Sequence, residues 1–215
     1  MTFLRLEEHR ALEQAIAAIQ HGGIVAYPTD TVYGIGASLH FDGALRRIFD
    51  VKGRSLEKIL PVLLASSGDL AKVSTGVDPR LLELASRFWP GPLTVAVPAK
   101  ASLPKEVVAE DGTVGVRVPA HSIALTLAQR CGGAIATTSA NLSGYPPARM
   151  AREIAQAVQS QVDIVLDGGI ARGGEPSTVI RLEGDTITLL RDGAISASVI
   201  DAAWQDVLRR HASPA

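Results

Sequence analysis

Residues 24–36 read Ile24-Val25-Ala26-Tyr27-Pro28-Thr29-Asp30-Thr31-Val32-Tyr33-Gly34-Ile35-Gly36. They open with an apolar run, which is typical of a buried strand. A proline ends the run, and Thr29, Asp30 and Thr31 then place two hydroxyls and a carboxylate side by side. We expect Gly34 and Gly36 to turn the chain. A strand that stops in such a cluster often presents a binding site at a sheet edge, although a purely structural turn would use the same residues.

The composition is that of a globular protein with an ordinary hydrophobic core. The 215 residues are 47% hydrophobic, and we expect residues 1–215 to form a single domain. The net charge of −1 provides no basic field for non-specific binding of nucleic acid. The single cysteine, Cys131, excludes an internal disulfide framework. No apolar run approaches the ~20 residues that span a bilayer, and residues 1–20 lack an apolar signal segment, so we expect a cytoplasmic protein with no membrane contact.

Hydrophobic periodicity predicts alternating helices and strands. We expect helices over residues 12–19, 44–49, 79–88, 121–130, 149–158 and 196–209. We expect strands over the opening run and over residues 59–65, 93–97, 114–118, 134–136, 163–166, 178–182 and 186–190. Asp42 and Asp78 are candidate N-caps. The last two strands flank Glu183-Gly184-Asp185 and should form a hairpin, so the fold class is α/β with a mixed sheet.

Two cationic patterns are candidates for anion binding. In Lys52-Gly53-Arg54, an extended backbone would point both cations to one side, and phosphate is their usual ligand. A solvated basic turn is the alternative. In residues 114–118, valines alternate with Gly115 and Arg117, so the arginine should lie on the face opposite the core. An arginine beside a glycine suggests a bound carboxylate or phosphate, with a surface salt bridge as the alternative.

Two polar patterns complete the candidates. Thr137, Ser139 and Asn141 should share one face of an extended segment, and this density of small hydrogen-bonding groups suggests a polar ligand such as a nucleotide. Ser177 follows a glycine-rich loop, with Arg191 at the far end of the hairpin, and this pattern is ordinary by itself.

Several catalytic signatures are missing from the sequence. It contains neither a P-loop nor a G-x-G-x-x-G motif. The five histidines are scattered, and we expect no metal ligands from protein side chains. Cys131 has no evident base, so covalent catalysis is not predicted. The remaining hydroxyls, amide and cations suit catalysis by positioning and by neutralising phosphate charge.

Taken together and in order, these motifs resemble the YrdC family of threonylcarbamoyl-AMP synthases. The resemblance covers about residues 10–195 and rests on residues 28–34 (PTDTVYG), 52–54 (KGR), 89–94 (WPGPLT), 116–119 (VRVP), 138–144 (TSANLSG) and 176–179 (PSTV). It implies a YrdC-like twisted mixed sheet with flanking helices and a large open concave cavity, followed by a C-terminal helix at about 196–210. Longer relatives add a linker and a second domain, which we do not expect within these 215 residues.

The resemblance also implies an activity. A nucleotidyltransferase would form threonylcarbamoyl-AMP and pyrophosphate from L-threonine, bicarbonate and ATP, with Mg²⁺ accompanying the ATP. A downstream threonylcarbamoyl-transferase complex would deliver the group to tRNA, so tRNA would be only an indirect partner.

Site residues carry over from matching positions in the family's motifs. Threonine would contact Thr31, Arg117, Ser139 and Ser177, with Arg117 on its carboxylate. ATP would contact Lys52, Arg54, Lys58, Thr113, Thr137, Ser139, Asn141, the backbone of Pro147, and Arg191. Lys52 and Arg54 would be catalytic, by neutralising the phosphates. Ser55 replaces the family's usual proline, and Lys58-Ile59-Leu60 replaces a common proline-leucine pair, which affects the expected course of this loop.

Three other functions compete with this one. An RNA-binding module would suit a concave surface, but the aromatic content is only 4% and the net charge is −1. A carbamoyl-adenylate-forming domain would normally occur with an acylphosphatase unit and zinc fingers. The third alternative is an anion-binding protein without turnover.

Overall fold

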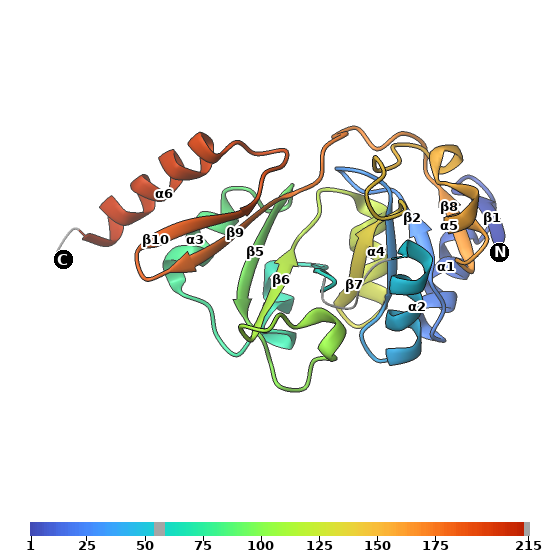
Figure 1. The fold of residues 1–215 in the computed structure, drawn as a ribbon, viewed down its shortest axis with the longest axis horizontal. Helices are drawn as coiled ribbons and strands as arrows, with labels where there is room; N and C mark the ends of the chain where they lie inside the picture. Colours follow the sequence, from blue (N-terminus) through green and yellow to red (C-terminus); the bar gives the residue numbers. More distant parts are fainter. Residues whose placement is uncertain (54–58, 213–215) are drawn as a thin grey trace.

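The computed structural model describes residues 1–53 and 59–212. Its described strands form one mixed sheet in the order β1-β8-β2-β3-β7-β4-β6-β5-β9-β10, with helices on both sides (Figure 1). The strands are β1 Thr2–Arg5, β2 Val25–Tyr27, β3 Gly34–Ser38, β4 Val62–Leu64, β5 Leu93–Pro98, β6 Thr113–Arg117, β7 Ala134–Ser139, β8 Ile164–Asp167, β9 Thr178–Glu183 and β10 Thr186–Arg191. The predicted α/β class with a mixed sheet is confirmed, and so is the β9–β10 hairpin. Strand β1 was not predicted.

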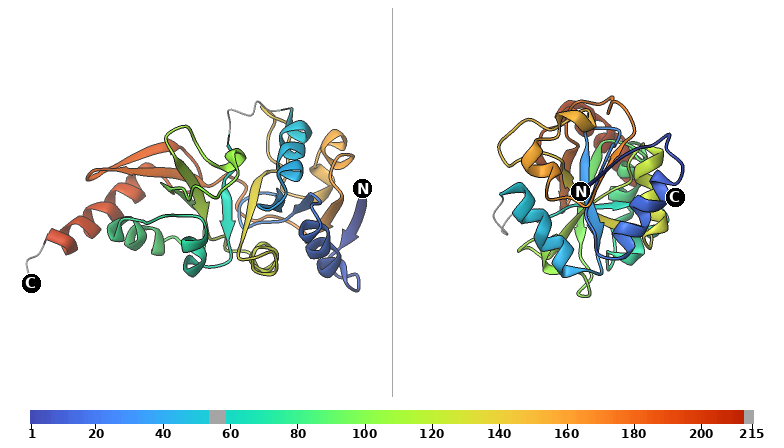
Figure 2. Two further views of the ribbon diagram at one scale, coloured as in Figure 1. Left: turned by 90° about the horizontal axis from the view of Figure 1, so that it is seen from below. Right: turned by 90° about the vertical axis from the view of Figure 1, so that its right-hand side faces the viewer.

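The helices lie on opposite faces of this sheet. They are α1 Ala11–Gln20, α2 Asp42–Lys52, α3 Pro79–Ser86, α4 Ser122–Arg130, α5 Gln156–Gln159 and α6 Ala197–Ala212, with 3₁₀ turns η1 Ser67–Lys72, η2 Lys105–Val107 and η3 Ala151–Glu153. Figure 2 shows α2 on one side of the sheet and α1 and α4 on the other. No helix within residues 1–53 and 59–212 combines the length and apolar character needed to cross a membrane.

Alternation along β2 explains why both faces are buried. Val25 and Tyr27 pack in the hydrophobic cluster that includes α1 and α4, whereas Ile24 and Ala26 pack in the larger cluster that includes α2. Successive side chains of a strand point to opposite faces, so one short apolar run contributes to both cores.

The prediction for Gly34 and Gly36 is wrong, because both lie inside strand β3 rather than in a turn. Strand β3 pairs antiparallel with β2, with Tyr27 opposite Gly34 and Val25 opposite Gly36. A Cβ at Gly36 would lie 2.8 Å from Cε1 of Tyr27, so the missing side chain makes room for the buried ring. The chain reverses instead through residues 28–33, and this loop carries the polar cluster.

Two further expectations need correction. The helix predicted over residues 149–158 is split into η3 and α5, because Ile154 and Ala155 are extended, with ψ of 122° and 139°. Asp42 is the first residue of α2 and does not cap it, since Phe41 occupies the N-cap position. Asp78 does cap α3, accepting a hydrogen bond from the Arg80 backbone N–H at 2.8 Å.

Candidate active site

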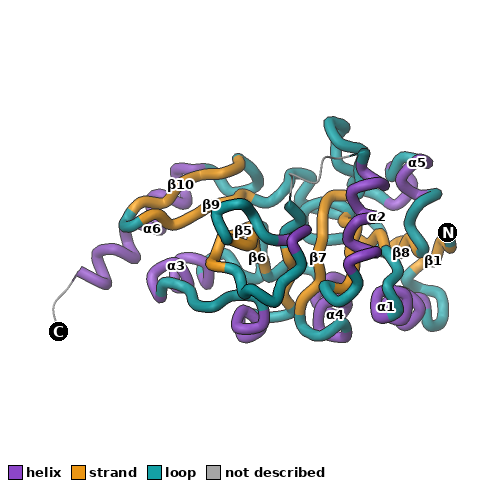
Figure 3. Tube along the Cα trace, turned by 60° about the horizontal axis from the view of Figure 1, so that its bottom comes forward, coloured by secondary structure: helices purple, strands orange, loops and turns teal. Residues whose placement is uncertain are grey.

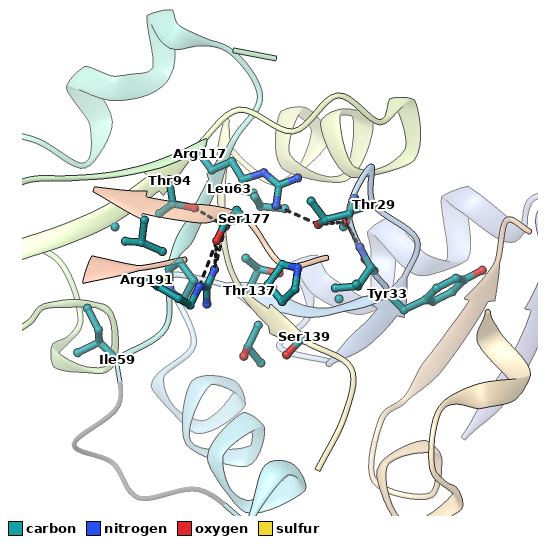
Figure 4. A pocket seen from close by; sticks show the side chains of 18 residues that line it. Thr29, Tyr33, Ile59, Leu63, Thr94, Arg117, Thr137, Ser139, Ser177 and Arg191 are labelled. Carbon is teal, nitrogen blue, oxygen red and sulfur yellow. Dashed lines mark hydrogen bonds between the residues drawn. The ribbon is translucent and has the colours of Figure 1, made fainter. Parts of the chain in front are cut away.

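A cavity of about 280 Å³ lies where the central strands and the loops after β2 and before β9 meet (Figure 4). Of the predicted site residues, those lining it are Thr31, Arg117, Thr137, Ser139, Ser177 and Arg191. Its other lining residues are Thr29, Val32, Tyr33, Gly34, Ile59, Pro61, Leu63, Thr94, Gly115, Thr138, Pro176 and Val179. Hydroxyl and guanidinium groups from six segments of the sequence therefore meet around one small space.

Arg117 is a buried cation with three protein contacts. Strand β6 points its valines into the core, as predicted, and Arg117 with Gly115 toward the cavity. Its Nε donates to the Gly91 carbonyl at 2.9 Å, and Nη1 donates to the Thr31 hydroxyl at 3.1 Å. Its Nη2 pairs with the Asp30 carboxylate, and the two side chains are only 8% and 13% exposed. The alternative of a surface salt bridge therefore does not hold, and Asp30 is the counter-ion of Arg117.

Thr29 orients Thr31, and it was not among the predicted site residues. The Thr29 hydroxyl donates to the Val32 carbonyl at 2.6 Å and accepts from the Thr31 backbone N–H at 3.1 Å. It also lies 2.9 Å from the Thr31 hydroxyl, which accepts from Arg117 and so directs its own proton to Thr29. A threonine two residues before Thr31 is typical of a side-chain-capped turn, and this signal could have identified it.

A second hydroxyl cluster surrounds Ser177, the residue that precedes β9. Its hydroxyl lies 2.8 Å from that of Thr94, a buried residue of β5 that was also not predicted. Arg191 donates through Nη2 to the Ser177 hydroxyl at 2.9 Å and to its carbonyl at 2.7 Å. In Figure 4, Ser177 lies between Arg117 and Arg191. The parallel pairing of β5 with β9 brings Thr94 and Ser177 together, and no local pattern in either strand indicates it.

Lys52 lies beside the cavity but is not one of its lining residues. It is the last residue of α2, and Gly53 adopts the left-handed conformation with φ of 56°, so residues 52 and 53 are not extended as expected. Its buried ammonium donates to the carbonyls of Ser139 and Asn141 at 2.6 and 2.8 Å, and to Asn141 Oδ1 at 3.1 Å. Lys52 thus holds the turn after β7. Arg54 and Lys58 lie outside the described residues.

The remaining predicted ATP residues divide between the wall and the surroundings of the cavity. The Thr137 hydroxyl lies 2.9 Å from that of Tyr27 and donates to the Ile35 carbonyl at 3.2 Å. Asn141 does not share the face of Thr137 and Ser139, because β7 ends at Ser139. Its Nδ2 instead donates to the carbonyls of the following turn.

Thr113 and Pro147 are likewise not among the lining residues. The Thr113 hydroxyl donates to Asp111 at 2.7 Å at the start of β6, and Pro147 is half-buried in the loop after β7. The structure therefore brings six of the predicted residues to the cavity. It places Lys52, Asn141, Thr113 and Pro147 outside its lining.

Burial keeps two neighbouring phenols and one thiol neutral. It raises the pKa of both Tyr27 and Tyr33 far above the ordinary range, so these phenols stay protonated and serve as hydrogen-bonding groups. Burial also raises the pKa of the Cys131 thiol to about 11, so the thiolate is scarce at neutral pH. Among the described residues, the polar side chains that line the cavity are neutral hydroxyls and the cations Arg117 and Arg191.

A cavity lined by hydroxyls and guanidinium groups on a mixed α/β sheet is an arrangement typical of small-molecule binding proteins. The model of the Sua5/YciO/YrdC family, described as telomere recombination, matches residues 17–193, and this chain belongs to that family. The threonylcarbamoyl-AMP synthase of Pyrococcus abyssi (strain GE5 / Orsay) is 38% identical over 197 residues, which are 92% of this chain and 58% of the relative. The chain therefore spans less than two thirds of that relative's length.

Two further comparisons agree with the family assignment. A putative threonylcarbamoyl-AMP synthase of Mycobacterium tuberculosis (strain ATCC 25618 / H37Rv) is 34% identical over 194 residues, covering 90% of this chain and 89% of the relative. The crystal structure of P. abyssi Sua5 complexed with L-threonine superposes with a TM-score of 0.86 at 36% identity, covering 94% of this chain and 60% of that one. The predicted family is confirmed, and so is the predicted mixed sheet with flanking helices.

Proposed function

We propose that this chain is a threonylcarbamoyl-AMP synthase, which forms threonylcarbamoyl-AMP and pyrophosphate from L-threonine, bicarbonate and ATP. The observation that carries the proposal is that Thr31, Arg117, Ser139 and Ser177, the residues expected to contact threonine, line one cavity. The names of the relatives and the threonine complex of P. abyssi Sua5 support the same activity.

Threonine would bind through its α-carboxylate to Arg117. A carboxylate–guanidinium contact is a strong charge-assisted hydrogen bond, and the site is shielded from water because Arg117 is buried. The neighbouring hydroxyls of Thr31 and Ser177 would complete the polar contacts. Apolar cavity residues such as Val32 and Leu63 provide surface for the substrate's methyl group.

The chemistry requires positioning rather than a protein nucleophile. Bicarbonate gives CO₂ and hydroxide, and the hydroxide takes one proton from the threonine ammonium and leaves as water. The amine nitrogen then forms a bond to the carbon of CO₂ and releases a second proton to solvent, which gives a carbamate. A carbamate oxygen then attacks the α-phosphorus of ATP, and the bond to pyrophosphate breaks. Carbamate and triphosphate are both anions, so cations must hold them together. Arg191, which lines the cavity, would be one of these cations, and Lys52 and Arg54 are the further cations expected to contribute.

Magnesium would accompany ATP as part of the substrate. Residues 1–53 and 59–212 contain no group of three or more His, Cys, Asp or Glu side chains placed to hold a metal ion. We expect phosphate oxygens and water to supply most of its ligands, as is common for this ion when it accompanies a nucleotide. Its charge would add to that of the cationic side chains in neutralising the leaving pyrophosphate.

The product is a reactive mixed anhydride, which a second enzyme must consume. We expect a threonylcarbamoyl-transferase complex in the cytoplasm to transfer the group to tRNA, so that this chain needs no tRNA contact of its own.

Pyrophosphate release tests the proposal. With ATP, Mg²⁺ and bicarbonate, the purified protein should release pyrophosphate only when L-threonine is added. Pyrophosphate release without threonine would contradict the proposed activity. Release when carbamoyl phosphate replaces threonine and bicarbonate would contradict it as well. A gel shift with double-stranded RNA at physiological salt tests the RNA-binding alternative in the same preparation.

A further inference from the structure

We define the carboxylate subsite as Asp30, Thr31 and Arg117, in which Asp30 pairs with Arg117. Asp30 is not among the residues that line the cavity, and its side chain is 13% exposed. Any effect it has on a ligand must therefore act through Arg117 or through its charge. Hydrogen bonds also hold the backbone of Asp30 and Thr31 in place. The Gly173 N–H donates to the Asp30 carbonyl at 3.0 Å, and the Gly174 N–H donates to the Thr31 carbonyl at 2.8 Å.

The contacts of Arg117 determine what it can offer a ligand. A guanidinium carries five N–H groups in one plane. Gly91, Thr31 and Asp30 occupy one each on Nε, Nη1 and Nη2. Among the described residues this leaves one N–H on each terminal nitrogen that a bound carboxylate could accept from. Partners on all three nitrogens also fix the plane of the group, so Asp30 helps to aim these two N–H groups.

The charges in the subsite cancel. Arg117 contributes +1 and Asp30 contributes −1, so a bound carboxylate leaves an excess negative charge in a buried place, which is costly. A zwitterion brings an ammonium group that restores neutrality, whereas a simple carboxylate does not. Lys52 and Arg191 lie close by and keep their positive charges, because their partners at Ser139, Asn141 and Ser177 are neutral groups, but these charges are the same in the wild type and in a variant at Asp30.

We propose that Asp30 positions Arg117 and sets the subsite's net charge to zero, so that the site selects a zwitterionic amino acid over the corresponding simple carboxylate. This inference rests on the proposed function, and it adds a positioning and specificity role for a residue that does not touch the substrate.

Binding of two ligands tests it directly. L-Threonine and 3-hydroxybutyrate differ by the ammonium group alone, and calorimetry gives the affinity for each. In the wild type, threonine should bind at least about tenfold more tightly. Asp30→Asn keeps an acceptor for Arg117 but removes the charge, so threonine should weaken by about tenfold while 3-hydroxybutyrate changes little, and the preference should shrink. Asp30→Glu keeps the charge and should keep the preference even if both affinities fall.

The pKa of His121 reports whether Asp30 carries a negative charge in the folded protein. Burial lowers the pKa of His121, and the negative charge of Asp30 partly offsets that effect. The pKa of His121 should therefore fall further in folded Asp30→Asn, as measured by NMR titration. Asp206→Asn, a carboxylate on α6 away from the cavity, should change neither the affinities nor this pKa.

The outcomes distinguish a failure of the proposed function from a failure of the role proposed for Asp30. If wild-type protein fails to bind threonine, the proposed function is wrong. If it binds threonine but Asp30→Asn weakens both ligands equally, Asp30 is only a structural residue and the inference is overturned. An unchanged His121 pKa in folded Asp30→Asn would overturn it as well. Loss of the preference in Asp30→Glu would do so even if the asparagine variant does not fold.

Discussion

Two arginine–aspartate pairs in this protein have the same chemistry and very different surroundings. Arg117 and Asp30 are 8% and 13% exposed, and Arg117 also donates to Gly91 and Thr31. Arg87 and Asp206 are 26% and 33% exposed, with Nη2 and Oδ2 2.7 Å apart. The first pair lies at the cavity, whereas the second joins α3 to α6 at the C-terminal end of the molecule (Figure 3).

This difference indicates which pair the protein depends on. Breaking a buried pair leaves a charge without a partner and without water, which is strongly unfavourable. An exposed pair exchanges its partner for water at little cost, and Asp206 has Arg209 and Arg210 as additional partners. We therefore expect large functional effects from the first pair and small effects on stability alone from the second.

The largest effect should follow from Arg117→Ala. This change removes the proposed carboxylate ligand and leaves Asp30 as an unpaired buried anion, so the free energy of unfolding should fall by about 3 to 5 kcal/mol. Threonine-dependent pyrophosphate release should fall at least about a hundredfold. Denaturant titration and the pyrophosphate assay measure the two effects. Activity within a few fold of the wild type would mean that threonine binds elsewhere.

An intermediate effect should follow from Gly173→Ala, which disturbs the pair through the backbone. An alanine Cβ would lie 2.5 Å from the Asp30 carbonyl oxygen and 2.9 Å from Cα of Thr31, so the loop must shift. We expect a loss of about 1 to 3 kcal/mol in stability and a higher KM for threonine with a smaller change in the KM for ATP.

Gly43→Ala is the matched control for that substitution. Its Cβ would meet nothing within 4 Å, and it lies in α2, so it should be neutral or stabilise by up to about 1 kcal/mol. If the two glycine variants had equal KM values for threonine, the packing of Gly173 against Asp30 and Thr31 would not matter for threonine binding.

The smallest effect should follow from Asp206→Asn, and it should depend on pH. Arg87 holds the pKa of the Asp206 carboxyl below its ordinary value of 3.8. A lowered pKa in the folded state stabilises the protein above pH 3.8 and loses that contribution as the pH falls toward the lower value. The variant should thus differ in Tm by no more than about 2 °C at pH 7, with unchanged activity, and the difference should shrink below pH 3.8. Calorimetry at pH 7 and pH 3 measures both values, and a difference that grows on acidification would reverse the assigned sign.

Local patterns predicted most elements because their causes are local. The valines of residues 114–118 alternate with Gly115 and Arg117, so the face of Arg117 followed from the two-residue period of a strand. Asp78 before Pro79 predicted the start of α3 because the capping bond spans only two residues. The turn predicted at Gly34 and Gly36 was wrong because packing decides the conformation there. Both glycines lie in strand β3, where Gly36 makes room for the ring of Tyr27.

The sequence by itself determined which chemical groups are available and the order in which they occur. It showed an arginine facing away from the core, hydroxyls next to apolar strands, and the absence of an evident nucleophile. Only the tertiary structure decided which groups meet. Arg117 pairs with Asp30, which lies 87 residues away in the sequence, and Lys52 donates to the Ser139 carbonyl, which is also 87 residues away. Such pairings depend on how β2, β3, β7 and β6 are ordered in the sheet, and that order is set by the packing of the whole core.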